Sequence, residues 1–373
     1  MKQEFETRAP MTSAAPVSPG SIEIGSNQDP GAPASPAPRS LRNSISKHWV
    51  MVAKVAFSSG LLWLLFSRID IGQFWSVARR SSVPWLTAAL AAYLVAVFAS
   101  SWRWHRLLLI QNVRMSFRTV TESFVVALFF NNFLPTNIGG DVMRVRDTAG
   151  PAGSSTRATT VVVADRIIGL MGLVFFAALG GIVSTQDRLP FSVAWIWVIF
   201  LAGAAASFAV LLVPATIDRL LQPFAFLRTG WIGAQIEGLT HSLINFRAAP
   251  VGLAASFAAA IFVQGANIAF YSAVARALGV HVGIWDMAVI VPLSALIQVV
   301  PVSVNGLGLR EAAFTFFFTR LGLPAEAALL VSLEATAMIL AFSLLGALLY
   351  IGRQLPAREL GTAVQPATVS TRL

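Results

Sequence analysis

Long apolar runs alternate with short, arginine-bearing loops along most of this chain. A helix needs about 17–25 mainly apolar residues to cross the hydrocarbon core of a membrane. Six runs reach that length: 49–66, 84–101, 159–182, 191–213, 250–275 and 325–351. The pattern predicts an all-α integral membrane protein with about six transmembrane helices.

Two shorter apolar runs end in a different way. Runs 119–134 and 286–300 each stop at a proline within a polar, glycine-containing stretch, "FLPTNIGGDVMR" and "VVPVSVNGLGLR". The proline, glycine and arginine have the same spacing in both, namely Pro135, Gly140 and Arg144 in the first and Pro301, Gly306 and Arg310 in the second. The shared spacing and context predict an internal repeat.

The arginine-rich loops predict how the two short runs lie. Cytoplasmic loops carry an excess of Lys and Arg, which places both termini and residues 144–157 in the cytoplasm. A full crossing by 119–134 would put the later loops on the wrong side, so we expect this run to enter the membrane and return. Run 286–300 then enters from the opposite face. Two oppositely oriented re-entrant hairpins form an inverted repeat, as in many secondary transporters. The loop with Arg68, Arg79 and Arg80 disagrees, because it would face outward.

Composition agrees with a membrane location. Of the 373 residues, 56% are hydrophobic and only 12% are charged, whereas a soluble domain has about 25% charged residues. The net charge of +10 is spread over short loops, where it sets topology and meets anionic headgroups. We therefore expect a multi-pass protein of a bacterial-type inner (plasma) membrane and no nucleic-acid partner.

The chain divides into three predicted parts. Residues 1–45 are rich in Pro, Ala, Ser and Gly and should be a disordered N-terminal tail. Residues 46–352 form the polytopic membrane domain, and 353–373 form a short C-terminal tail. Within the domain, 216–247 is amphipathic and is expected to lie on the membrane surface.

The polar stretches predict a binding site. Irregular backbone at membrane depth is tolerated only where protein or a water-filled cavity satisfies it, so each stretch should line a cavity. A helix that begins after the break would direct its positive end at a phosphate, and an arginine can bind the phosphate through two donors. The candidate residues are Asn137, Gly139, Gly140, Asp141 and Arg144 in the first hairpin, and Asn305, Gly306, Arg310 and Glu311 in the second. The alternative is that the arginines are headgroup anchors at the membrane surface.

Asp165 and Arg166 lie inside the predicted span 159–182. Ionisable residues within a span are costly and mark functional sites by default, so both join the predicted substrate-binding residues. An ion pair that packs this helix against its neighbours is an equally weighted alternative.

Other chemistry has little support in the sequence. There is no cysteine, and the four histidines are dispersed without metal-ligand spacing. No nucleophile–base pair or nucleotide-binding motif is present. We therefore expect neither catalysis nor a metal or cofactor.

The stretches "FLPTNIGGDVMRV", "VPVSVNGLGLREAAF" and "SSWRWHRLLL" resemble the lysylphosphatidylglycerol synthase transmembrane (flippase-like) family over about 49–352. In such relatives a soluble aminoacyltransferase domain follows the membrane domain, but only some twenty residues follow the last predicted span here. The resemblance therefore implies a standalone flippase-like domain without synthase activity. Thr136-Asn137 departs from the small residues of many relatives, which leaves headgroup specificity open.

The function expected is a lipid translocator that moves an anionic phospholipid or a polyprenyl-phosphate-type lipid between leaflets. The alternatives are a membrane enzyme or accessory subunit that acts on lipid headgroups, and a lipid-binding scaffold that does not transport. Homo-oligomer formation is left open.

Overall fold

The structure is a computed structural model that describes residues 81–134, 138–183, 245–299 and 306–362, together with isolated positions at 60, 63, 303 and between 194 and 205. The chain divides into two units, residues 1–47 and 48–373, and every described residue belongs to the second. The predicted tail 1–45, and nearly all of 49–66, 191–213 and 216–247, lie outside the described residues.

Four described helices are long and apolar enough to cross a membrane. They are α3 (Val83–Ile110), α6 (Ser155–Val183), α10 (Pro250–Ala277) and α13 (Ala325–Thr362), the last over Ala325–Arg353. They confirm four of the predicted helices, and the described residues contain no strand. Large apolar side chains on their outer faces are exposed, including Phe98 (52%), Phe262 (57%) and Leu348 (65%). Such surfaces are expected where lipid, not water, surrounds the helices.

Two helix ends differ from the sequence prediction. Helix α3 continues to Ile110 and not only to 101, so Arg103 and Arg106 are helical and do not belong to a loop. The predicted span 84–101 stopped short of these two arginines. Arg103 nevertheless lies in the helix, where its side chain is buried within the protein. Helix α13 runs on to Thr362, so the predicted tail from 353 begins inside this helix.

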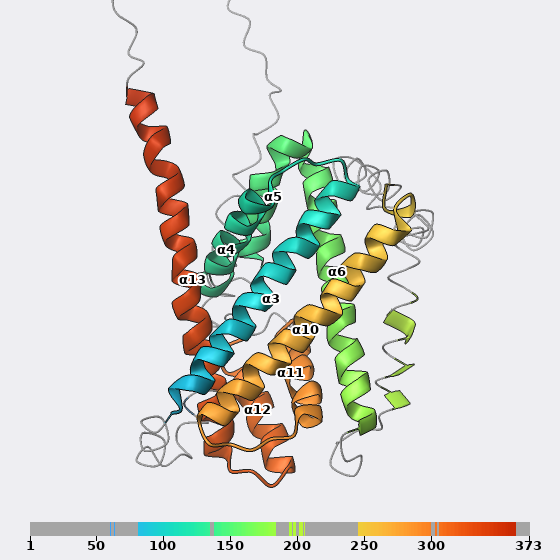
Figure 1. Cartoon of the computed structure of the whole chain (residues 1–373), viewed down its shortest axis with the longest axis vertical. Helices are drawn as coiled ribbons and strands as arrows, with labels where there is room; N and C mark the ends of the chain where they lie inside the picture. The colour runs from blue at the N-terminus through green and yellow to red at the C-terminus, as the bar shows by residue number, and fades with distance from the viewer. Residues whose placement is uncertain are drawn as a thin grey trace, which may run out of the picture. The chain divides into compact units, whose positions relative to one another are not determined.

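Four shorter helices form two pairs. Helix α4 (Phe117–Phe133) packs on α5 (Gly139–Ala152), and α11 (Ile284–Val299) packs on α12 (Leu309–Arg320). In Figure 1 the α4–α5 pair lies toward the upper end of the helices and the α11–α12 pair toward the lower end. The Ser116 hydroxyl accepts a hydrogen bond from the Thr119 backbone N–H (3.1 Å), which caps the start of α4.

The repeated spacing does not place the two arginines at the same helical position. Arg144 is the sixth residue of α5, whereas Arg310 is the second residue of α12. Helix α12 begins closer to its arginine than α5 does, because Gly308, with a φ of 82°, is the N-cap residue of α12. The backbone N–H of Gly308 donates a hydrogen bond to Glu311 Oε2 (2.6 Å). The predicted repeat therefore holds for the spacing but not for the helix register.

The long helices pack closely around the two pairs. Helix α3 lies along α10, where the Tyr93 and Phe270 rings are 5.3 Å apart. Helix α6 approaches α10 at Gly172, where an added Cβ would lie 3.0 Å from the Ala260 carbonyl oxygen. One buried apolar cluster includes Phe270 and residues of α11, α12 and α13, and a second includes Trp104 and residues of α6.

Candidate functional site

The two arginines of the repeated motif each line a cavity among the described helices. The Arg144 cavity has a volume of about 370 Å³ and the Arg310 cavity has a volume of about 220 Å³. Gln264 of α10 lines both. The two arginines therefore line adjoining cavities and do not share one.

Three helices bring charged side chains to the Arg144 cavity. Helix α5 supplies Asp141 and Arg144, which share a helix face because they are three positions apart. Helix α6 supplies Asp165 and Arg166, and α3 supplies Arg103. Four of these five residues were predicted from sequence as binding residues.

The five charges form one network. Asp165 Oδ1 accepts from Arg103 Nε at 2.7 Å, and Asp165 Oδ2 accepts from Arg144 Nη2 at 2.8 Å. Asp141 Oδ1 lies 3.7 Å from Arg144 Nη1, and its other oxygen accepts from Arg166 Nε. Asp165 is 2% exposed, so the two guanidinium groups take the place of water as partners of its carboxylate. The structure thus confirms that Asp165 forms ion pairs that join its helix to its neighbours. A role of Asp165 in substrate binding stays a prediction.

The network leaves positive charge and donors in excess. Three arginines and two aspartates line the cavity, so its described lining carries a net charge of +1. Arg103 Nη1 and Arg144 Nε are buried and have no hydrogen-bond partner among the described residues. Buried donors without partners are costly, and an anion in the cavity would satisfy them.

Arg144 is also held from one side by an aromatic ring. Its guanidinium carbon lies 4.3 Å from the ring centroid of Trp104, which is fully buried. The Trp104 ring therefore packs against a cation inside the protein. Likewise Arg144 is 5% exposed and Arg310 is 8% exposed, so neither has the exposed head of a headgroup anchor.

The glycines at the start of α5 permit close packing against α4. An added Cβ on Gly140 would meet the Ala127 carbonyl oxygen and the Asn131 side chain, and one on Gly139 would lie 2.7 Å from Leu134 Cδ1. The Gly140 N–H donates to Asn131 Oδ1 (2.8 Å), so it is not free to bind a ligand in this structure. Asn131 itself lines the Arg144 cavity.

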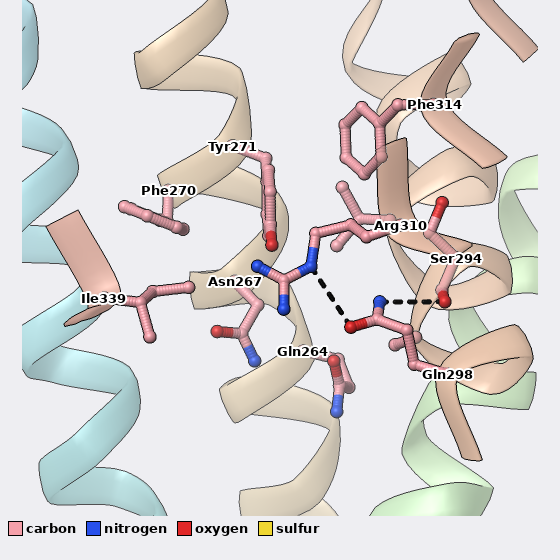
Figure 2. A pocket seen from close by; sticks show the side chains of 11 residues that line it. Gln264, Asn267, Phe270, Tyr271, Ser294, Gln298, Arg310, Phe314 and Ile339 are labelled. Carbon is pink, nitrogen blue, oxygen red and sulfur yellow. Dashed lines mark hydrogen bonds between the residues drawn. The ribbon is translucent and has the colours of Figure 1, made fainter. Parts of the chain in front are cut away.

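The Arg310 cavity lies between α10, α11, α12 and α13, and Figure 2 shows its lining. Arg310 donates from Nε to Gln298 Oε1 (3.1 Å) and from Nη1 to Thr336 Oγ1 (2.7 Å). No carboxylate lines this cavity within the described part of the chain. Arg310 is thus a buried cation that is held by neutral groups.

The other described residues that were predicted as binding residues in the second hairpin, Gly306 and Glu311, make contacts within the protein. Gly306, with φ 73°, lies against the Gln298 side chain, where a Cβ would not fit. Glu311 is fully buried and accepts from the Gly308 N–H and from Ser332 Oγ (3.1 Å), so both its oxygens are used within the protein and it lines neither cavity. Asn137, Asn305 and the two prolines of the motif lie outside the described residues.

Sequence reasoning missed Arg103 and Gln264. Arg103 continues the buried face of α3 that includes Tyr93, Val97 and Ser100, and this helical period was the available signal. Gln264 lies inside the predicted span 250–275, where a polar side chain is costly, and this was the available signal. No group of three or more potential metal-ligating side chains was found within the described ranges.

The apolar helices and the charged cavities within them define a multi-pass membrane protein with a buried polar site. Comparison of sequences then gives the family: the chain belongs to the family described as lysylphosphatidylglycerol synthase TM region, which matches residues 51–347. The family match covers the membrane region, as the resemblance implied, and no aminoacyltransferase domain is matched.

One curated relative is UPF0104 membrane protein PH1989 of Pyrococcus horikoshii. The identity is 23% over 184 residues, which cover 48% of this chain and 52% of that relative. The chain thus spans about half the length of the relative it matches, and the relative's name states only that it is a membrane protein.

Proposed function

We propose that this protein moves a phosphate-bearing lipid between the leaflets of the inner membrane, with the phosphate bound in the Arg144 cavity. The observation that carries the proposal is the excess positive charge of that cavity, together with the unpartnered buried donors Arg103 Nη1 and Arg144 Nε. A phosphodiester supplies one negative charge and several acceptor oxygens, and charge-assisted hydrogen bonds from arginine are among the strong ones.

The arrangement of the short helices supports a transporter rather than an enzyme. The α4–α5 and α11–α12 pairs lie toward opposite ends of the long helices in Figure 1, as two re-entrant hairpins entering from opposite faces would. Inverted repeats with binding sites at broken helices are typical of secondary transporters. Residues 144–157 and both termini would then be cytoplasmic.

Reconstitution into liposomes tests the proposal, with leaflet-selective quenching of labelled phospholipids and polyprenyl phosphates as the readout. Arg144→Lys keeps the charge but loses the planar fork, and the loss of one charge-assisted hydrogen bond should slow transport by about ten- to a hundred-fold. Arg146→Lys is the matched control, because Arg146 lies on the same helix, is exposed and donates to Tyr350 Oη.

Arg103→Lys is tested in the same way, and thermal unfolding of all three variants establishes that they fold. If folded Arg144→Lys and Arg103→Lys proteins transport every lipid at the parent rate, the Arg144 cavity is not the phosphate site. If the parent accelerates no lipid but binds one, the protein is a lipid-binding scaffold.

Orientation has its own test. The chain has no cysteine, so a single cysteine at Gly150, which is exposed in α5, can be labelled without background. We expect membrane-impermeant reagents to reach it only from the cytoplasmic side. Labelling only from outside would overturn the re-entrant arrangement of α4 and α5.

A further inference from the structure

The Arg310 cavity has a wall of uncharged polar groups along one face of α10. Gln264, Asn267 and Tyr271 follow one another at helical spacing and lie one below another beside the Arg310 guanidinium in Figure 2. The amides of Gln264 and Asn267 make no hydrogen bond within the described residues. A polar side chain that lacks a hydrogen-bond partner inside a membrane span costs free energy. The amides of this wall therefore need hydrogen bonds from a ligand or from water.

Helix α11 adds two more polar groups to the same cavity. Gln298 donates from Nε2 to the Ser294 carbonyl oxygen (2.9 Å) and accepts from Arg310. Ser294 is fully buried, and its hydroxyl has no partner in the described part of the chain. The cavity therefore presents amides and hydroxyls, which both donate and accept hydrogen bonds.

This chemistry matches a ligand with several neighbouring hydroxyl groups. A hydroxyl also donates and accepts, so each can pair with an amide on one side and with the Arg310 donors on the other. An ammonium group only donates and is stabilised by a carboxylate, and none lines this cavity among the described residues. Arg310 would repel it as well.

We propose that the Arg310 cavity is a headgroup subsite for vicinal hydroxyls, and that the lipid is a phosphodiester with a polyol headgroup, either glycerol or a sugar-like ring. This inference rests on the proposed function, because it places the phosphate in the Arg144 cavity. Gln264 lines both cavities and contacts the headgroup where the phosphate joins the polyol.

The test compares four lipids with the purified full-length protein. Phosphatidylmethanol has the phosphodiester without a polyol, phosphatidylglycerol and phosphatidylinositol add glycerol and a ring polyol, and phosphatidylethanolamine adds an ammonium. Transport is measured in liposomes, and binding is measured as the rise in melting temperature with short-chain forms of the same lipids. We expect phosphatidylglycerol or phosphatidylinositol to exceed the other two in both measurements, and the better of these two identifies the polyol.

Asn267→Leu is close in shape to the parent and removes one amide. It should weaken binding of the preferred polyol lipid by about three- to ten-fold, the value of one or two neutral hydrogen bonds, and leave phosphatidylmethanol within about two-fold. Ser256→Ala is the control, because it removes a hydroxyl from the same helix that bonds to the Gly252 carbonyl and lines neither cavity.

The outcomes separate this inference from the proposed function. A polyol preference in binding that Asn267→Leu reduces, with phosphatidylmethanol binding nearly unchanged, supports the subsite, even if the parent moves no lipid and the transport proposal fails. Equal binding of phosphatidylmethanol and the polyol lipids by the parent overturns the subsite, even if transport occurs. An equal loss for all four lipids in Asn267→Leu also overturns it.

Discussion

Arg103 Nε lies 2.7 Å from Asp165 Oδ1, although the two residues are 62 positions apart in the chain. This contact joins α3 to α6 inside the candidate membrane region, and Asp165 extends it to α5 through Arg144. One buried carboxylate thus fixes the mutual positions of three helices that line the Arg144 cavity.

Replacing Asp165 should destabilise the protein strongly. Asp165→Asn leaves Arg103 and Arg144 buried with one negative charge fewer, and removal of one partner from a buried ion pair costs about 3–5 kcal/mol. Thermal unfolding in detergent micelles measures the loss. Arg103→Met should cost less in the Asp165→Asn background than in the parent, by about 0.5–3 kcal/mol, and strictly additive effects would contradict the contact.

Two glycines of α5 should respond differently to an added methyl group. Gly140→Ala forces the new Cβ onto α4, and such overpacking costs about 1–3 kcal/mol. Gly150→Ala meets nothing within 4 Å beyond its chain neighbours, so it should change stability by less than about 0.5 kcal/mol, because better helix propensity is opposed by crowding against Pro151. Melting temperatures of the two variants check the prediction, and a similar shift for both would count against the close α4–α5 packing.

Glu311 should matter for the start of α12. Glu311→Gln removes the negative charge, so the bond from the Gly308 N–H is no longer charge-assisted, and the contact with Ser332 Oγ persists only if the amide N–H donates to the hydroxyl. We expect a loss of about 1–3 kcal/mol, as for a hydrogen bond to a buried charged group. Glu326→Gln, in the first turn of α13, is the control and should change stability by less than about 0.5 kcal/mol.

Acid should weaken the junction of α4 and α13. The hydrogen bond from Arg118 to Glu122, with a further one from Arg353, holds the pKa of Glu122 below its ordinary value. A lowered folded-state pKa contributes stability above the unfolded value of about 4.3, and that stability is lost as the pH falls through the folded pKa. The difference in melting temperature between the parent and Glu122→Gln should therefore shrink from pH 6 to pH 3. A constant difference would show that the Glu122 charge contributes nothing to folding.

Hydropathy located the four described spans because lipid-facing helices need apolar sequence whatever their partners. It ended the first of them too early at Arg103, because a local pattern cannot show that this charge meets Asp165 on another helix. The motif spacing singled out Arg144 and Arg310, which both line cavities, but it could not show that the two cavities are separate. That division depends on where α10 places Gln264, which only the packed structure reveals.

The stacking of Arg144 on Trp104 has an optical consequence. The emission wavelength of an indole depends on the local electric field, and a guanidinium 4.3 Å from the ring centroid is a large part of that field. A ligand that draws Arg144 away, or adds a negative charge beside it, will shift the fluorescence of Trp104. In a variant that keeps Trp104 and replaces the other nine tryptophans of the chain, the protein carries its own reporter of cavity occupancy, with no attached dye.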